Sequence, residues 1–474
     1  MWQAVQRPLA AFPLLSLLLL IPCFWQSRIQ AGDLSSHIYN AWLAQLIELG
    51  QAPGLYLAHP TTNVLFDLAL DRLLGVLGAG PAQRIAVAVS VLIFSWGAFA
   101  FASVIAGRRA WHLLPLIAML SYGWAFHMGF FDFYLSLGIC FAGLAWCWNR
   151  RPLQMLPALA LVPIAWLAHA IPVVWALGIL VYARIIGRLS NRLQVRIALA
   201  LVLIFLIVRV VLGSVTQTIW YPAQIMSAIG VDQLWVFDRK YAVVCMGLLA
   251  LWGLGIATLY RDGKIRDITS GIPYQICALT VLGICILPSN ISIPGYRHSL
   301  SFIAERMSLP IAVCLCGLIG RARVLPRQTY AAAALALLFF GFLYHDEGIL
   351  NSVEDRMEHI VAQAPPGQRM LSAIKAANLR VNAFTHMIDR ACIGRCYSYA
   401  NYEPASAAFR VRTDAPNPIV TASFVDSWRM ELGTYVLKES EIPVYGINLD
   451  SNQKMVLLSL LPGVPVGITE WNPL

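Results

Sequence analysis

Residues 196–215 read RIALALVLIFLIVRVVLGSV, an apolar run that Arg209 interrupts near its end. Its length is close to the ~20 residues that a helix needs to cross the hydrocarbon core of a bilayer. Further stretches of this kind lie at 9–29, 85–106, 111–128, 130–148, 153–168, 170–187, 241–260, 272–289, 302–320 and 328–345. Those at 153–168 and 170–187 are short, so one kinked hairpin is an alternative there. The sequence therefore predicts an all-α polytopic membrane bundle with about eleven transmembrane helices.

The composition agrees with a chain that lies mostly in lipid. Of 474 residues, 59% are hydrophobic and only 12% are charged, whereas soluble proteins average about a quarter charged residues. The net charge of +10 would suggest nucleic acid in a soluble protein. Here the basic residues fall mainly in short loops, so membrane topology explains them better and we expect no nucleic-acid partner.

The short basic loops all fall on one side of the predicted bundle. They contain Arg7, Arg108–Arg109, Arg150–Arg151, Arg184–Arg196, Arg261–Arg266 and Arg321–Arg327. Basic loops stay in the cytoplasm, so we expect a cytoplasmic N-terminus with a retained first helix, Leu9–Trp25, rather than a cleaved signal peptide. An odd number of spans then places the C-terminus outside.

Two regions outside the apolar stretches suggest further structure. The predicted bundle covers 1–345 and has a long first outside loop, 30–84, in which 34–49 and 63–77 have the pattern of surface helices. Residues 346–474 are more polar and contain short strand-like runs, which predicts a small C-terminal α/β domain in the outside compartment. Cys392 and Cys396 in this tail are either disulfide-bonded or free thiols.

Polar residues collect where these segments meet the outer face. Asp33 follows the first apolar stretch, and His37 lies four residues later on the same side of a helix; the simpler role of Asp33 is to cap that helix. His59 precedes the second loop helix and is equally explained by a turn. Asp132 and its aromatic neighbours fit a tight turn at the interface.

Cationic residues lie in other outside segments. Arg297 and His298 precede the tenth stretch, and Glu305 and Arg306 open it, either as an anion site or as an interfacial ion pair. Arg209 either reaches the interface or faces an anionic partner in the bundle. A carboxylate can act as general base on a hydroxyl, and cations can hold a phosphate leaving group, so the set suits group transfer from a lipid phosphate.

The arrangement resembles the GT-C superfamily of membrane glycosyltransferases, which use polyprenyl-phosphate sugars. The resemblance covers about residues 1–345 in architecture and rests on three short motifs: Gly32-Asp33 with His37 after the first helix, His59-Pro60, and Glu305-Arg306 opening a late span. A soluble domain after the last span is also common in that family. The chain departs from its pattern because Leu34 follows Asp33 and Met307 replaces an aromatic residue.

The resemblance implies an inverting glycosyltransferase in the bacterial inner membrane, with a periplasmic C-terminal domain. Asp33 would be the catalytic carboxylate and Arg306 would bind the donor phosphate, helped by Arg209 or Arg297. The acceptor would be a glycan, lipid or protein, and a divalent metal stays open. The alternatives are a transporter or flippase, which would need polar groups at mid-membrane, and a non-catalytic assembly or sensory protein.

Overall fold

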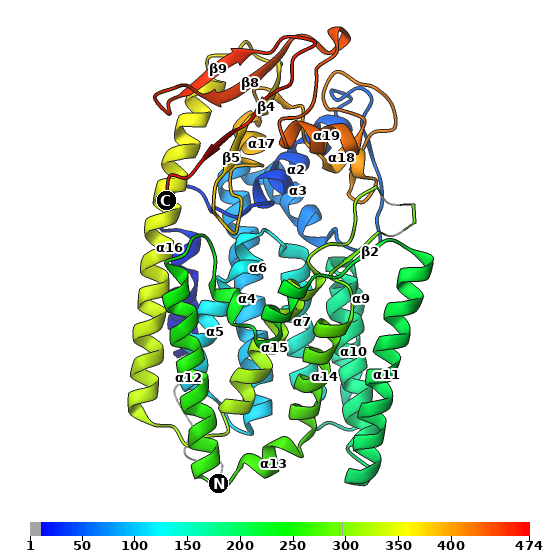
Figure 1. Cartoon of the computed structure of the whole chain (residues 1–474), viewed down its shortest axis with the longest axis vertical. Helices are drawn as coiled ribbons and strands as arrows, with labels where there is room; N and C mark the ends of the chain where they lie inside the picture. The colour runs from blue at the N-terminus through cyan, green and yellow to red at the C-terminus, as the bar shows by residue number, and fades with distance from the viewer. Residues whose placement is uncertain (1–10, 293, 296) are drawn as a thin grey trace.

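The computed structural model describes residues 11–292, 294–295 and 297–474. Most of this chain is helical. Long apolar helices run side by side through the body of the molecule, and the C-terminal elements cover one end of them (Figure 1). Arg7, the first residues of the predicted run at 9–29, and Tyr296 lie outside the described residues.

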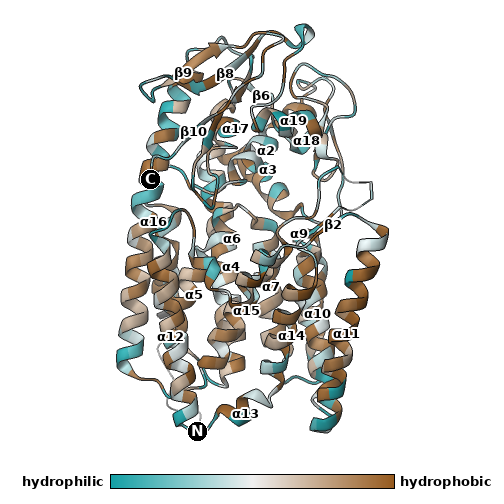
Figure 2. Cartoon of the chain, in the orientation of Figure 1, coloured by the Kyte–Doolittle hydropathy of each residue, from teal (hydrophilic) through white to brown (hydrophobic). Residues whose placement is uncertain are grey.

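Four helices are long and apolar enough to cross a membrane: α4 (Ala79–Ala106), α11 (Asn191–Val215), α12 (Tyr241–Arg261) and α16 (Pro326–Val361). Shorter apolar helical segments cover Phe12–Cys23, Phe131–Cys147, Pro152–Ala168, Ala170–Ile186 and Ile272–Ile286. Hydrophobic residues, in brown, predominate along these helices in Figure 2. The prediction of a helical membrane protein is thus supported, while the count of about eleven spans stays a prediction.

The remaining elements complete the order along the chain. The other helices are α1 (Ala11–Leu20), α2 (Leu34–Glu48), α3 (Leu65–Leu77), α5 (Leu114–Ser121), α6 (Trp124–His127), α7 (Phe131–Cys147), α8 (Leu156–Leu159), α9 (Val162–Ala168), α10 (Ala170–Ile186), α13 (Ile265–Thr269), α14 (Ile272–Ile286), α15 (Ile303–Ile319), α17 (Met387–Cys392), α18 (Glu403–Ser406) and α19 (Phe424–Glu431). Short 3₁₀ helices cover Ile21–Cys23, Trp111–Leu113, Pro152–Met155, Pro222–Ile229, Val231–Leu234 and Glu439–Glu441.

Small residues bring the central helices together. A Cβ atom on Gly97 of α4 would lie 2.2 Å from the carbonyl oxygen of Gly138 in α7, and one on Gly138 would lie 2.7 Å from the Cα of Phe94. Glycine on both faces therefore allows the two backbones to touch, as is common between helices in lipid. By contrast, α11 stands at the edge of the bundle (Figure 1) and buries only Gln194 among its side chains.

The first loop contains the two predicted helices, α2 and α3, but α2 is not a surface helix. Its first eight residues, Leu34–Ala41, are all buried, including polar Ser36 and Asn40. The C-terminal tail covers them: Asn401 donates to the Asn40 side-chain oxygen at 2.9 Å, and the Tyr39 hydroxyl accepts from the backbone N–H of Ser398 at 2.9 Å. The expected water-facing side of α2 is therefore a protein interface.

The tail contains both helices and strands. A four-stranded sheet has the order β6 (Tyr397–Ser398), β4 (Arg369–Ser372), β8 (Val444–Leu449) and β9 (Met455–Ser459); only the β8–β9 pair is antiparallel. The minor pairings are β1 (Tyr56–Leu57) with β7 (Val411–Arg412), β2 (Thr218–Ile219) with β3 (Asn290–Ile291), and β5 (Ile374–Ala376) with β10 (Thr469–Trp471). Since β1 belongs to the first loop and β7 to the tail, the loop and the tail form a two-stranded sheet together.

The expected division at residues 345 and 346 falls inside α16, which continues as one helix to Val361. Beyond the apolar part, this helix carries Glu354, which is fully buried and receives two hydrogen bonds of 2.6 Å from Arg390 of α17. Arg390 also donates to Gln83 of α4 and to the carbonyl of Ile29. The tail is therefore fixed onto the bundle by a buried ion pair.

Candidate functional site

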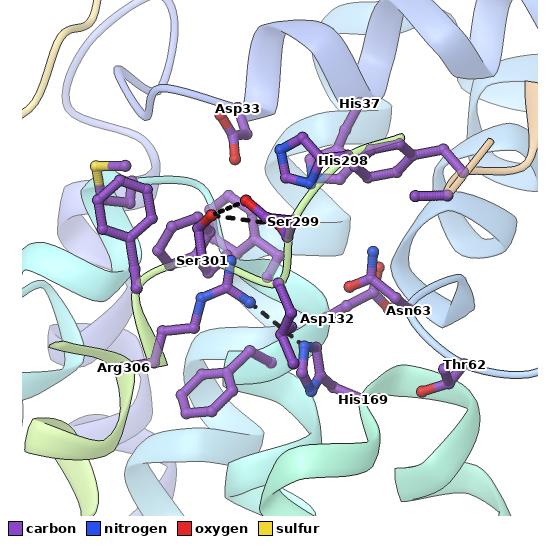
Figure 3. A pocket seen from close by; sticks show the side chains of 18 of the residues that line it. Asp33, His37, Thr62, Asn63, Asp132, His169, His298, Ser299, Ser301 and Arg306 are labelled. Carbon is purple, nitrogen blue, oxygen red and sulfur yellow. Dashed lines mark hydrogen bonds between the residues drawn. The ribbon is translucent and has the colours of Figure 1, made fainter. Parts of the chain in front are cut away.

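A cavity of about 550 Å³ lies where one end of the bundle meets the first loop and the tail. Five residues singled out from the sequence line it: Asp33, His37, Asp132, His298 and Arg306. Figure 3 shows their side chains converging from separate elements. The prediction that Asp33 and Arg306 share a site is consistent with this geometry.

Asp33 is held at the edge of this cavity by its backbone. The backbone N–H of Asp33 donates to the carbonyl oxygen of Met128 at 3.0 Å, and the N–H of Gly32 donates to the carbonyl oxygen of His127 at 2.7 Å. Gly129, with φ at +86°, lies so close that a Cβ atom there would be 2.6 Å from the Asp33 nitrogen. The expected capping role does not occur, because the Asp33 carboxylate makes no capping hydrogen bond to α2. The carboxylate is thus not occupied by the helix terminus, and Asp33 lines the cavity.

The tail supplies a histidine next to this carboxylate. His386 Nε2 lies 3.8 Å from Asp33 Oδ1, and His386 Nδ1 lies 3.1 Å from Asp389 Oδ2. Burial lowers the pKa of His386, but the hydrogen bond and charge of Asp389 outweigh it and raise the pKa to about 9. At neutral pH the ring is therefore a cation between two carboxylates.

His37 does not pair with Asp33, although the two are one helical turn apart. Its Nδ1 contacts Asp67 Oδ1 of α3 at 2.7 Å. Burial lowers the pKa of His37, but the charge of Asp67 and the bond to it raise the pKa to about 10. His37 therefore stabilises the packing of α2 against α3 and adds a positive charge to the wall of the cavity.

Arg306 lines the cavity without a partner of opposite charge among the described residues. Its guanidinium carbon lies 3.7 Å from the centre of the Phe130 ring, a cation–π stack. No carboxylate of the described residues lies within ion-pairing distance of Arg306, and its buried Nε has no hydrogen-bond partner there. An arginine in such a position is suited to an anionic ligand.

His169 faces Arg306 in an arrangement that needs an acceptor. Its Nδ1 accepts the backbone N–H of Ile171 at 3.2 Å, so a neutral ring carries its proton on Nε2. Arg306 Nη1, itself a donor, lies 3.3 Å from that Nε2. With this tautomer the two N–H groups face each other, and an anionic oxygen beside them could accept a hydrogen bond from both. This histidine was not among the residues singled out from the sequence.

Four candidates from the sequence do not line the cavity. His59 is exposed. Arg209 stacks 4.9 Å from the centre of the Trp220 ring and donates to the carbonyl of Ile286, which corresponds to interfacial anchoring. Glu305 accepts from Tyr221 and Ser289 rather than pairing with Arg306. Arg297 donates to the carbonyl of Ala405 and so fastens its loop to the tail.

The tail also builds the upper wall of the cavity. Phe424, Trp428 and Glu431 occupy one face of α19 and line the cavity together with Tyr402 and His386. Burial raises the pKa of Glu431 to about 7, against the opposing effect of His386. The sequence carried no local signal for these residues, because nothing in the tail resembles a known motif and its docking on α2 is a tertiary contact.

Two further features bear on candidate groups. Cys392 and Cys396 form a disulfide at the end of α17, away from the residues that line the cavity. Within the described residues, no group of three or more His, Cys, Asp or Glu side chains is arranged to hold a metal ion. The donor set of the described residues therefore does not fit the divalent metal that the resemblance left open.

A second cavity, of about 530 Å³, adjoins the first. It lies between α10, α11, α14 and α15, and apolar side chains such as Trp175, Phe205 and Leu279 line almost all of it. Ala170 and Ile171 line both cavities. The cavity that contains the charged residues thus shares part of its wall with an apolar groove at the edge of the bundle, a combination that suits an amphipathic ligand.

Comparison of the chain with protein families, with curated proteins and with solved structures finds no match.

Proposed function

We propose that the protein is a membrane glycosyltransferase of the inverting type, which transfers a sugar from a polyprenyl-phosphate donor to an acceptor hydroxyl. The observation that carries the proposal is that Asp33, a carboxylate, and Arg306, an arginine without a carboxylate partner in the described part of the chain, line the same cavity. The Asp33 carboxylate makes no capping bond and the Arg306 guanidinium has no carboxylate partner among the described residues. One group can accept a proton and the other can hold a phosphate.

The adjoining apolar groove supports a lipid-linked donor. Its lining is almost wholly apolar, and it shares Ala170 and Ile171, next to His169, with the cavity that contains Asp33. A polyprenyl chain in the groove would place its phosphate beside Arg306 and the Nε2 of His169. The sugar would then occupy the cavity that contains Asp33.

The chain's own residues account for the proposed reaction in one displacement. The acceptor hydroxyl loses its proton to Asp33 while its oxygen forms a bond to the anomeric carbon of the sugar. The bond between that carbon and the phosphate oxygen breaks, and its electron pair leaves with the phosphate. Arg306 and His169 stabilise the charge that develops there. The anomeric carbon is inverted because the acceptor attacks opposite the leaving group.

The orientation predicted from the basic loops fits this chemistry. We infer about eleven spans, a cytoplasmic N-terminus and an extracytoplasmic tail in the inner membrane of a bacterium, so that the site opens at the outer face. Alkaline phosphatase is active only outside the cytoplasm, so a fusion of this enzyme after Leu474 is expected to be active. An inactive fusion, with an active fusion at the loop 261–266, would contradict this orientation.

The geometry favours an enzyme over a transporter. Arg306, near the N-terminus of α15, and Asp33, in the first loop, both line a cavity at one end of the bundle. A transporter is expected to bind its substrate near mid-membrane between broken helices. A non-catalytic assembly protein would have no need for an arginine without a carboxylate partner in the same cavity as Asp33.

The proposal is tested by transfer assays with purified protein and a panel of radiolabelled polyprenyl-phosphate sugars. Asp33→Asn is expected to lower the turnover by at least about a hundredfold while donor binding persists, because only the proton acceptor is lost. Arg306→Gln is expected to weaken donor binding as well. His59→Gln, an exposed position outside the cavity, is the control. Full activity in Asp33→Asn would refute the assignment.

A further inference from the structure

Three buried polar atoms without partners lie around the same cavity. Among the described residues, Thr62 Oγ1, Asp132 Oδ2 and Arg306 Nε are inaccessible to water and make no hydrogen bond, and all three residues line it. Buried polar atoms of this kind are rare in proteins because their desolvation is costly. The phosphate of the proposed donor would supply a partner for Arg306 Nε. Thr62 and Asp132 remain without an explanation.

Asp132 is positioned by one of its oxygens, which leaves the other free. The side chain is 2% exposed and lies in the first turn of α7. Its Oδ1 accepts the backbone N–H of Phe66 at 2.9 Å, at the start of α3. The N-termini of α3 and α7 both stabilise a negative charge there. The contact with α3 therefore explains why Asp132 lies here and what its Oδ1 binds. It does not explain why Oδ2 is buried without a hydrogen-bond partner.

Thr62 and Asn63 extend this wall of the cavity. Their loop is fixed to the end of α9, since the N–H of Asn63 donates to Ala168 at 2.9 Å. Both residues line the cavity, and Figure 3 shows Asn63 directed toward the region of Asp132. The wall thus offers a carboxylate oxygen, a hydroxyl and an amide on rigid backbone.

We propose that Asp132, Thr62 and Asn63 form a subsite that binds adjacent hydroxyl groups of the transferred sugar. This inference rests on the proposed function and names the residues that select the sugar rather than the lipid. A free carboxylate oxygen accepts hydrogen bonds from hydroxyls, and the Thr62 hydroxyl and Asn63 amide both donate and accept. The hydroxyl groups on neighbouring carbons of a sugar ring also donate and accept hydrogen bonds.

Other ligands fit this wall less well. A phosphate would find no cationic side chain among Asp132, Thr62 and Asn63. A metal ion would need more anionic ligands than this single carboxylate, and no metal-type cluster occurs among the described residues. His37, which also lines the cavity, is held positive by Asp67 and would repel a cation. Neutral hydroxyl groups need neither a cationic partner nor several anionic ligands, so they fit this wall best.

The test separates sugar binding from lipid-phosphate binding. The full-length protein in detergent is titrated with polyprenyl phosphate and with a panel of polyprenyl-phosphate hexoses and pentoses. The wild-type protein is expected to bind at least one sugar-bearing lipid more tightly than the bare lipid phosphate. Asp132→Asn is expected to reduce that gain by roughly tenfold or more, the loss typical of a hydrogen bond to a charged group. Binding of bare polyprenyl phosphate should stay unchanged.

Two more variants make the result specific. Thr62→Val removes the hydroxyl at almost constant volume and is expected to reduce the same sugar-dependent gain, so the proposal stays testable if Asp132→Asn misfolds. Arg306→Gln is expected to weaken both ligands equally, which tests the proposed function by itself. His59→Gln is the matched control in the same loop and should change neither constant.

The outcomes are distinguishable. If Asp132→Asn and Thr62→Val leave the sugar-dependent gain unchanged while Arg306→Gln weakens both ligands, the subsite is refuted and the proposed function survives. If no member of the panel binds more tightly than bare polyprenyl phosphate, the subsite is also refuted. Binding that requires a divalent metal in the wild type but not in Asp132→Asn would make Asp132 a metal ligand instead. Absence of any binding to wild type would overturn both proposals.

Discussion

Asp33 depends on one glycine for its position. Gly129 approaches the Asp33 nitrogen so closely that a Cβ atom would overlap it, and its φ of +86° is in the left-handed region. We predict that Gly129→Ala lowers turnover by more than about tenfold, because the backbone that carries the carboxylate must shift. The measurement is the transfer rate at saturating donor and acceptor.

Gly107→Ala is the matched control for this variant. Gly107 also has a left-handed φ, of +70°, but open space surrounds the position of its missing Cβ. Both substitutions incur a similar cost in backbone strain of about 1–2 kcal/mol. Equal losses of turnover in the two variants would show that strain alone is responsible, and would contradict the role of Gly129.

His386 is expected to make the reaction sensitive to alkaline pH. The ring faces Asp33, Asp389 and Glu431, and its pKa is raised to about 9. Below that pH the imidazolium orients the Asp33 carboxylate, and the interaction is lost as the pH rises through about 9. We predict that the wild-type turnover falls over this range. His386→Gln should have a turnover lower by roughly tenfold to a hundredfold and no such alkaline decline.

The comparison of pH profiles distinguishes positioning from simple packing. His359→Gln, at an exposed histidine near the end of α16, should keep both the wild-type rate and the alkaline decline. A His386→Gln profile with the same decline as wild type would contradict the role assigned to this histidine, whatever the absolute rate.

At the scale of single residues, sequence reasoning found some of the cavity and missed the rest. Asp33 and Arg306 could be predicted because an ionisable group beside an apolar helix is costly and thus informative. His386 and Glu431 could not, since they reach the cavity only when the tail docks on α2. Arg209 was ambiguous for a related reason: the sequence places it near a helix end but does not show that the helix faces outward.

Among the elements, α16 connects bundle and tail. It extends well past its apolar part, and its buried Glu354 accepts two hydrogen bonds from Arg390 of α17. Removing one partner of a buried ion pair leaves the other charge uncompensated. We predict that Glu354→Gln lowers the free energy of unfolding by about 3 kcal/mol, measured by denaturant titration of tryptophan fluorescence in detergent.

Glu470→Gln is the control for this prediction. Glu470 is an exposed glutamate of β10, so its substitution should change stability by less than about 0.5 kcal/mol. A similar small change in Glu354→Gln would mean that the buried pair does not fix the tail. It would also remove the reason to expect His386 to be held rigidly beside Asp33.

The helices themselves were largely predictable, and their environment was not. Each apolar stretch coincides with helical structure in the described residues, because apolar runs of that length specify helices in lipid. The periodicity of 34–49 also predicted α2 correctly. It could not show that the polar side of α2 is covered by Asn401 and Ser398 rather than by water, since those contacts come from distant sequence.

For the molecule as a whole, composition was enough to indicate a membrane protein, and the charge of the short loops suggested its orientation. What the structure adds is the relation between two cavities. One cavity contains Asp33 and Arg306, the other is almost wholly apolar and runs along α10 and α14, and the two share Ala170 and Ile171. That shared wall is the reason for expecting one amphipathic substrate rather than two separate ligands.

The most direct test of this account is mass spectrometry of lipids that co-purify with the full-length protein. The wild-type protein is expected to carry an isoprenoid phosphate, and Asp33→Asn, which keeps Arg306 and the apolar groove, is expected to accumulate the sugar-bearing form. Arg306→Gln should lose most of this lipid. Wild-type protein without any isoprenoid phosphate, or equal amounts in wild type and Arg306→Gln, would contradict the central claim.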